Sequence, residues 1–120
     1  MGAALRAGVI GLGAMGRHHV RVLREIDGVD VVAVADPAGD PYRVAGALDV
    51  LPDVEALIAA GIDMAVVAVP TKFHEQVALT LAAAGVHTLV EKPIAVDTDA
   101  GARLVAAFDA AGLVGAVGHI

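Results

Sequence analysis

The 120-residue sequence contains no cysteine and no serine. Without cysteine the chain forms neither a disulfide nor a thiolate metal site, which fits a reducing compartment. Without either residue these side chains cannot carry out acyl transfer through a serine or cysteine nucleophile. The sequence therefore excludes a disulfide scaffold and a serine or cysteine hydrolase among these residues.

Aromatic residues and positive charges are also scarce. The chain has one tyrosine, two phenylalanines and no tryptophan, and 8 Lys and Arg stand against 14 Asp and Glu, a formal net charge of −6. Nucleic-acid sites need basic residues for the phosphates and rings for stacking. We therefore expect no nucleic-acid partner.

Long apolar runs are missing as well. The longest stretch without Asp, Glu, Lys or Arg is 76–90, which is too short to cross a bilayer and contains Gln, Thr, Gly and His. No secretory signal is visible at the amino terminus, so we expect a cytoplasmic protein without a membrane partner. A hydrophobic fraction of 58% excludes disorder, and the length suits one domain.

Apolar, β-branched runs alternate with amphipathic stretches along the whole chain, as in repeated βαβ units. These runs predict six strands, over 6–10, 31–35, 49–51, 64–69, 88–90 and 113–117. Three helices are predicted over 41–47, 53–60 and 98–111, and two more carry the stripes described next. Right-handed crossovers then give an α/β, doubly wound parallel sheet in the order 3-2-1-4-5-6, a Rossmann fold in a single domain over 1–120.

Two predicted helices carry an apolar stripe that we expect to pack on the sheet. The first stripe consists of Met15, His19, Val22, Leu23 and Ile26, with Gly28 placed to stop the helix. The second consists of Phe73, Val77, Leu81 and Ala84, followed by Gly85.

A glycine-rich motif, G-x-G-x-x-G, directly follows the first predicted strand and opens the first helix. It reads Gly11-Leu12-Gly13-Ala14-Met15-Gly16. The first glycine permits a tight turn, the second lets the backbone approach a pyrophosphate, and the third lets helix and strand pack closely. The helix amino terminus then presents N–H groups to the phosphates. In this context the motif predicts dinucleotide binding rather than an ordinary glycine-rich turn.

Asp36 ends the second predicted strand, where a carboxylate can accept hydrogen bonds from an adenosine ribose. The same carboxylate repels a 2′-phosphate, so we expect NAD as the cofactor in preference to NADP. Arg43 is the guanidinium that would relieve this repulsion if its side chain reached the ribose.

Two other motifs, a P-loop and a zinc-binding helix, are incomplete in this sequence. Gly11 and Gly16 also fit a P-loop, but Arg17-His18 stands where that loop needs Lys and then Ser or Thr. His74-Glu75 would begin a zinc-binding H-E-x-x-H helix, but Ala78 occupies the place of the second histidine. We therefore expect no metal site, and we interpret His74 as a local hydrogen-bonding or packing residue.

Each of the other histidines has its own expected environment. His19 lies on the packing stripe and is expected to be half-buried, whereas His18 faces solvent and His87 precedes a strand. His119 follows the last predicted strand, at the carboxyl edge where ligands of this architecture bind, which makes it a candidate for a functional contact.

Glu91-Lys92-Pro93 follows the fifth predicted strand, also at the carboxyl edge of the sheet. A lysine at this position would face a cofactor in the crevice of a doubly wound sheet. The alternative is an exposed surface lysine in a strand-to-helix loop.

These features together resemble the Gfo/Idh/MocA oxidoreductases, named after glucose-fructose oxidoreductase and inositol dehydrogenase. The resemblance rests on the glycine motif, Asp36-Pro37, the loop Ala68-Val69-Pro70-Thr71 with His74 after it, Glu91-Lys92-Pro93 and Gly118-His119, and it covers nearly the whole chain. Thr71 departs from the asparagine more common there. The resemblance implies NAD or NADP as cofactor and a Lys92-Pro93 peptide bond that is often cis.

The resemblance also implies roles for particular residues. Lys92 would be catalytic, beside the nicotinamide and the reacting hydroxyl. The predicted cofactor-binding residues are Gly11, Leu12, Gly13, Ala14, Met15, Gly16, Asp36, Val69, Pro70, Thr71, His74, Glu91, Lys92 and Pro93.

The resulting hypothesis is the nucleotide-binding domain of a dehydrogenase that moves a hydride between nicotinamide and a hydroxyl-bearing carbon of a sugar, polyol or nucleotide sugar. Family members continue into a second α/β domain that binds the substrate, so we expect this chain to be the amino-terminal part of a longer homo-oligomeric enzyme and inactive alone. Redox-driven elimination is a variant of the same chemistry. A non-catalytic NAD sensor is the alternative, which Lys92 disfavours because a sensor has no evident need for it.

Overall fold

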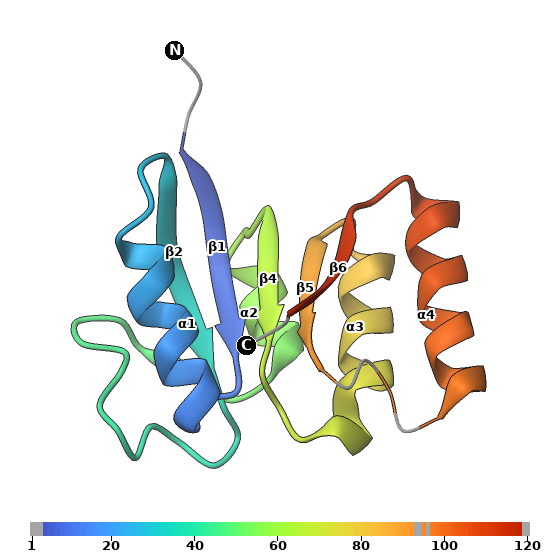
Figure 1. Cartoon of the computed structure of the whole chain (residues 1–120). Coiled ribbons are helices and arrows are strands. Elements are labelled where there is room, and N and C mark those ends of the chain that lie inside the picture. Colours follow the sequence, from blue (N-terminus) through green and yellow to red (C-terminus); the bar gives the residue numbers. More distant parts are fainter. Residues whose placement is uncertain (1–3, 93–94, 96, 119–120) are drawn as a thin grey trace.

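The computed structural model describes residues 4–92, 95 and 97–118. It contains a six-stranded, fully parallel sheet in the order β3-β2-β1-β4-β5-β6 (Figure 1). The strands are β1 (Leu5–Ile10), β2 (Val29–Ala35), β3 (Val50–Leu51), β4 (Met64–Val67), β5 (His87–Glu91) and β6 (Gly115–Gly118). The predicted number and order of strands are confirmed.

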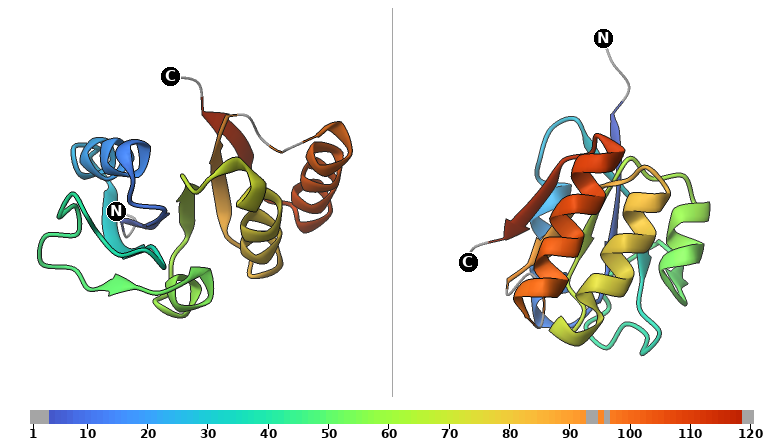
Figure 2. Two further views of the ribbon diagram at one scale, coloured as in Figure 1. Left: turned by 90° about the horizontal axis from the view of Figure 1, so that it is seen from below. Right: turned by 90° about the vertical axis from the view of Figure 1, so that its right-hand side faces the viewer.

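Helices cover the two faces of the sheet unequally. They are α1 (Ala14–Arg24), α2 (Val54–Ala59), the short 3₁₀ helix η1 (Thr71–Phe73), α3 (His74–Ala83) and α4 (Thr98–Ala111). Figure 2 shows α1 on one face and α2, α3 and α4 on the other. This is the doubly wound arrangement predicted from the sequence. Among the described residues, none of the helices has the length and apolar character needed to traverse a membrane.

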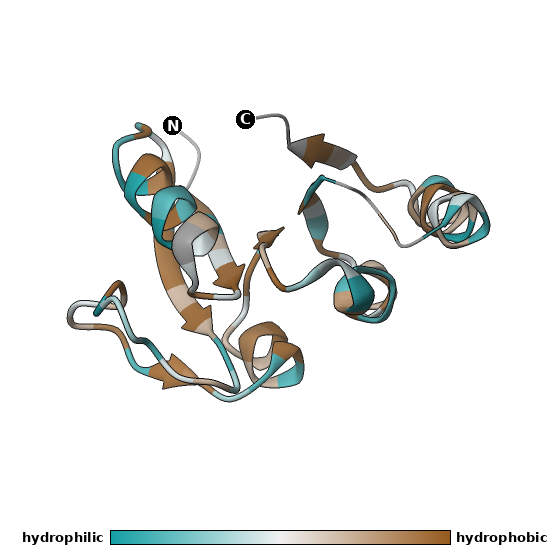
Figure 3. Ribbon diagram, turned by 60° about the horizontal axis from the view of Figure 1, so that its bottom comes forward, coloured by the Kyte–Doolittle hydropathy of each residue, from teal (hydrophilic) through white to brown (hydrophobic). Residues whose placement is uncertain are grey.

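Each face of the sheet has its own apolar core. Under α1, Val20 and Leu23 pack with Val9 and Val66 of the sheet. On the opposite face the second core joins residues of the sheet to α2, α3 and α4: Ile10, Val67, Val90, Leu57, Leu81, Leu104 and Phe108. Because the central strands are buried on both faces, they read as continuous apolar runs, visible as brown ribbon in Figure 3.

The helices α2 and α4 begin at aspartates that cap them. The Asp53 carboxylate accepts a hydrogen bond from the backbone N–H of Ala56 at 2.8 Å, and Asp97 accepts one from Ala100 at 2.8 Å. Such a cap stabilises a helix by about 1 kcal/mol, because it satisfies an N–H group that has no partner within the helix.

The predicted stripe of α1 is partly wrong: Leu23 is buried and His19 is half-buried as predicted, but the other three members are not buried. Gly16, Val20 and Leu23 are buried, whereas Met15, Val22 and Ile26 are 36%, 37% and 46% exposed. A Cβ on Gly16 would lie 1.7 Å from the carbonyl oxygen of Gly11, so the glycine faces the turn at the closest approach of helix and strand. This backbone contact sets the rotation of α1 about its axis and overrides the apolar pattern. The helix also ends at Arg24, before Gly28.

The predicted stripe of α3 is also partly wrong: Leu81 is buried and Val77 packs against the core, but Phe73 and Ala84 are not buried. His74, Ala78, Leu81 and Ala82 are buried, whereas Phe73 is 44% exposed and Ala84 is exposed. Small alanines face the sheet and allow close packing, while the larger ring of Phe73 lies at the surface. Because both sides of this helix are apolar, the sequence pattern does not indicate which side faces the sheet.

The helix predicted over 41–47 is wrong, since the segment forms successive turns. The Asp40 carboxylate accepts hydrogen bonds from the backbone N–H groups of Val44 and Ala45, both at 2.8 Å. Arg24 donates to the carbonyl oxygens of the same two residues, both at 3.1 Å. Side chains thus satisfy backbone groups that a helix would pair internally, and Arg43 has a left-handed φ of 54°.

Candidate functional site

A cleft of about 750 Å³ opens at the carboxyl edge of the sheet, where β1, β2 and β4 end. Its size lies within the range of small-molecule sites. Among the predicted site residues, the cleft is lined by Gly11, Gly13, Met15, Asp36, Val69 and Pro70. Further lining residues, which are not among the predicted cofactor-binding residues, are Ile10, Pro37, Ala38, Asp53, Val54, Glu55, Ala68, Phe73, Gln76, Val77 and Thr80.

The three glycines of the turn have three different environments. Gly11 has a φ of 97°, and a Cβ there would lie 2.6 Å from the backbone carbonyl of Ala68. Gly16 would clash with Gly11, as described above. Gly13 has no atom within 4 Å of where its Cβ would be. The first and third glycines therefore permit close backbone packing, and the second leaves open space beside the cleft.

The amino terminus of α1 lies at this turn. Gly13 is its N-cap residue, no side chain caps the helix, and the first turn has no acidic residue. An uncapped helix start carries a partial positive charge and N–H groups suited to an anion. The open position of Gly13 and the α1 terminus together fit a pyrophosphate group.

Asp36 connects the end of β2 to the glycine turn. One carboxylate oxygen, Oδ2, accepts a hydrogen bond from the backbone N–H of Leu12 at 2.8 Å, and Oδ1 accepts one from Ala38 at 2.8 Å. The carboxylate is half-buried and borders the cleft. Since each carboxylate oxygen has a second acceptor position, Asp36 can still bond a ligand hydroxyl while it holds the turn.

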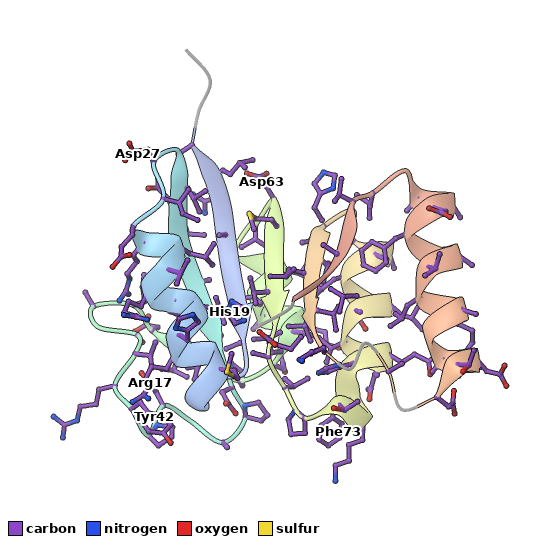
Figure 4. The ribbon with its side chains drawn as sticks, in the orientation of Figure 1. Arg17, His19, Asp27, Tyr42, Asp63 and Phe73 are labelled. Carbon is purple, nitrogen blue, oxygen red and sulfur yellow. The ribbon has the colours of Figure 1, made fainter. Side chains whose placement is uncertain are left out.

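Two further carboxylates, Asp53 and Glu55, border the cleft with Asp36. Arg43 does not line it. Arg43 lies instead along a separate groove, which basic residues of α1 also line. One of these is Arg17, whose guanidinium stacks over the Tyr42 ring at 4.6 Å (Figure 4). In this structure Arg43 is therefore not placed to relieve the repulsion between Asp36 and a 2′-phosphate.

His74 holds the loop after β4. Its side chain is 1% exposed, and its Nε2 is hydrogen bonded to the carbonyl oxygen of Val69 at 2.8 Å. The interpretation of His74 as a local hydrogen-bonding residue is confirmed. Val69 and Pro70 reach the cleft, while Thr71 starts η1 outside its lining.

The Glu91-Lys92 pair lies at the end of β5, outside the lining of this cleft. Glu91 is 8% exposed and bonds His19, and Lys92 is exposed. His19 is half-buried, as expected. Pro93, with its predicted cis bond, and His119 lie outside the described residues.

The remaining predicted residues, Leu12 and Ala14, are part of the glycine turn and the start of α1. Leu12 is fully buried in the core under α1, and it approaches the site through its backbone N–H. Ala14 begins α1. The predicted strand order could have indicated Asp53 and Glu55 as site residues. They follow β3, whose carboxyl end points to the same edge of the sheet as those of β1 and β2.

Comparison with known proteins identifies the family. A family model described as "Oxidoreductase family, NAD-binding Rossmann fold" matches residues 5–119. The chain belongs to this family. The resemblance to Gfo/Idh/MocA oxidoreductases is thereby confirmed, and NAD is the cofactor of the family's Rossmann domain.

Curated relatives in the family are dehydrogenases. Inositol 2-dehydrogenase of Corynebacterium glutamicum is 34% identical over 113 residues, covering 88% of this chain and 33% of the relative. UDP-N-acetylglucosamine 3-dehydrogenase of Acidithiobacillus ferrooxidans is 36% identical over 119 residues, covering 97% and 37%. This chain thus spans about a third of the length of these curated relatives.

Solved structures of family members share the fold. The structure of the A. ferrooxidans UDP-N-acetylglucosamine 3-dehydrogenase matches with a TM-score of 0.88 at 35% identity, covering 98% of this chain and 39% of that one. GenD2 from gentamicin A biosynthesis, solved in complex with NAD, matches with a TM-score of 0.87 at 33% identity, covering 98% and 35%.

Proposed function

We propose that this domain binds NAD in the cleft at the carboxyl edge and serves as the cofactor-binding part of a dehydrogenase. The reaction is hydride transfer between nicotinamide and a hydroxyl-bearing carbon of a sugar, polyol or nucleotide sugar. The glycine turn carries the proposal: its open second glycine and uncapped α1 terminus border a cleft in a chain of an NAD-binding family. The inositol and UDP-sugar dehydrogenases among its relatives support the substrate class.

The turn and Asp36 divide the binding of NAD between them. Backbone N–H groups of the turn and the start of α1 hold the pyrophosphate, which Gly13 allows to approach closely. The free acceptor positions of Asp36 bond the adenosine ribose. The predicted contacts of Leu12, Ala14, Met15, Val69, Pro70, Thr71, His74, Glu91 and Pro93 stay predictions at the level of individual residues.

Lys92 acts at the reacting end. NAD, when bound, supplies the nicotinamide ring that accepts the hydride. As the substrate hydroxyl becomes a carbonyl, negative charge develops on its oxygen, and the Lys92 ammonium stabilises that charge. The position of Lys92 at the end of β5 supports this role, because the carboxyl edge is where this fold places its ligands.

Calorimetric titration of this chain with NAD and NADP tests the cofactor assignment. We expect saturable NAD binding and NADP binding weaker by about tenfold or more, because Asp36, Asp53 and Glu55 would repel a 2′-phosphate. Equal or tighter binding of NADP would contradict the proposal that the Asp36 carboxylate repels a 2′-phosphate. Absence of NAD binding by a folded chain would contradict the proposed function itself.

A charge-matched pair of variants separates Asp36 from general electrostatics. Asp36→Asn should weaken NAD binding by about tenfold, because it removes a charged acceptor from the ribose site. Asp109→Asn removes the same charge from the exposed face of α4, outside the cleft, and should leave NAD binding unchanged. Equal losses in both variants would show that Asp36 contributes only through net charge.

The wider setting of the domain is also part of the proposal. The expected substrate-binding partner domain, homo-oligomeric assembly and cytoplasmic location all stay predictions from the sequence and the resemblance. Incubation of this chain with NAD and a panel of sugars and polyols should give no sustained production of NADH. Steady turnover would show that the substrate site lies within these residues.

A further inference from the structure

A hydrogen bond joins two distant parts of the chain next to Lys92. The Nε2 atom of His19 on α1 bonds the Oε1 atom of Glu91, the last residue of β5, across a separation of 72 residues. The two side chains are only 12% and 11% exposed. Figure 4 shows His19 extending from α1 toward the middle of the sheet.

The alternation of β5 explains why Glu91 reaches α1. Val90 belongs to the core on the α2–α4 face, and Leu89 packs against the core on the α1 face. Because side chains alternate along a strand, Glu91 shares the α1 face with Leu89. The strand order places β4 between β1 and β5, so the bond from α1 to Glu91 passes over the end of the sheet's central strands.

The two partners of the bond are each next to a residue of the proposed site. His19 lies one helical turn after Gly16, on the helix whose amino terminus faces the pyrophosphate position. Glu91 directly precedes Lys92. A rigid link between them therefore fixes the separation between the glycine turn and the lysine, which must match the length of the bound cofactor.

Removing one partner would leave the other nearly buried and unpaired. Such a group costs free energy unless water enters or the backbone moves. Either response shifts the end of β5, and Lys92 moves with it because it is the next residue along the chain.

We propose that His19 and Glu91 are positioning residues that hold Lys92 at a fixed distance from the glycine turn. This inference rests on the proposed function of Lys92. The positioning role requires no direct contact of either side chain with substrate or cofactor.

The sequence offers an unusually clean test, because the chain has only two lysines, Lys72 and Lys92. Reductive methylation with ¹³C-formaldehyde followed by NMR gives one signal for each lysine. In His19→Leu we expect the Lys92 signal to shift or broaden while the Lys72 signal stays in place, since Lys72 lies on η1 and does not depend on the bond. His19→Gln, whose amide still donates a hydrogen bond, should restore the original Lys92 signal.

Kinetics of the dehydrogenase that contains this domain give the functional readout. His19→Leu should lower kcat by about tenfold or more, because a small displacement of a catalytic group is costly, while the dissociation constant of NAD changes by less than about threefold. His19→Gln should recover most of the rate. A role confined to stability would lower the melting temperature but leave kcat unchanged at temperatures well below unfolding.

Glu91→Gln provides an independent variant if His19→Leu does not fold. Its amide oxygen still accepts the bond from His19, so the Lys92 signal should stay near its original position. A Lys92 signal unaffected by His19→Leu would overturn the positioning role. An unchanged kcat in Lys92→Met would instead contradict the proposed function while leaving the structural link intact, so the two failures are distinguishable.

Discussion

Two parts of the carboxyl edge, the glycine turn and the end of β5, are held together by different kinds of contact. At the glycine turn, every contact involves the backbone: Gly11 packs on the Ala68 carbonyl, Gly16 packs on Gly11, and the Asp36 carboxylate accepts hydrogen bonds from backbone N–H groups. At the end of β5, the contacts are made by side chains, with Glu91 bonded to His19 and Lys92 exposed.

This difference has consequences for how each part responds to change. A backbone site has little room to adjust, because a Cβ added at Gly11 or Gly16 meets main-chain atoms. A substitution in a site made of side chains should have a graded effect, since one side chain can be replaced by another of similar length. Cofactor affinity and reaction rate should therefore depend on separate sets of residues.

The largest expected effect is that of Gly16→Ala. Its Cβ would lie 1.7 Å from the Gly11 oxygen, so the turn or α1 must move. We expect a loss of stability of about 3 kcal/mol or more and no measurable NAD binding. Thermal unfolding and fluorescence titration with NADH measure the two effects.

Gly13→Ala is the matched control, because the added methyl group has no protein neighbour within 4 Å. The variant should fold with nearly unchanged stability but bind NAD more weakly, as the methyl group occupies the space left for the pyrophosphate. If Gly16→Ala bound NAD as well as the original chain, the turn could not be the rigid backbone site described above.

The next effect is expected at Lys92, in the dehydrogenase proposed above. Lys92→Met keeps the length of the side chain and removes the charge, so kcat should fall by about a hundredfold, equivalent to about 3 kcal/mol. The dissociation constant of NAD should change by less than about threefold. Lys72→Met removes the other lysine, which lies on η1, and should alter neither constant. A collapse of NAD affinity in Lys92→Met would make Lys92 a cofactor anchor instead.

The sequence predicts the backbone part better than the side-chain part, for physical reasons. Gly11, Gly13, Gly16 and Asp36 act through local geometry, which a short motif after a strand is enough to indicate. The bond between His19 and Glu91 depends on how α1 lies over the sheet, and residues 72 apart carry no such signal.

The same limit explains the errors in helix orientation. Both sides of α1 carry large apolar residues, with Val20 and Leu23 on the buried side and Met15 and Val22 on the more exposed one. Periodicity alone could not choose between these sides, because the choice depends on the close approach at Gly16. The turns over 41–47 depend on Asp40 and Arg24, whose side-chain bonds compete with helix formation.

A moderate effect on stability alone is expected for Asp97→Ala. The carboxylate caps α4 through the N–H of Ala100, so its loss should lower stability by about 1 kcal/mol. NAD affinity and the Lys92 NMR signal should not change, because the cap belongs to neither part of the edge. A Lys92 signal that moved in this variant would show that general destabilisation, rather than the bond to His19, controls the lysine.

The smallest effect is expected for the exposed pair of Glu75 and Arg103, which links α3 to α4. The hydrogen bond from Arg103 lowers the pKa of Glu75 below its usual 4.5. A lowered folded-state pKa means that the stabilisation is present above the unfolded pKa and is lost as the pH falls through the folded one. Melting temperatures of the original chain and Arg103→Gln should therefore differ slightly at pH 7 and converge in acid. A difference that grew in acid would contradict this pairing.

The two hydrogen bonds that Asp36 accepts have a consequence for protein engineering. Removing this carboxylate would lessen the repulsion of a 2′-phosphate, yet the same atoms accept hydrogen bonds from the backbone N–H groups of Leu12 and Ala38. A small neutral replacement would leave two backbone N–H groups without an acceptor, and asparagine offers one oxygen where two are used. A redesign of cofactor choice would therefore have to supply new acceptors for the turn before it adds a partner for the phosphate.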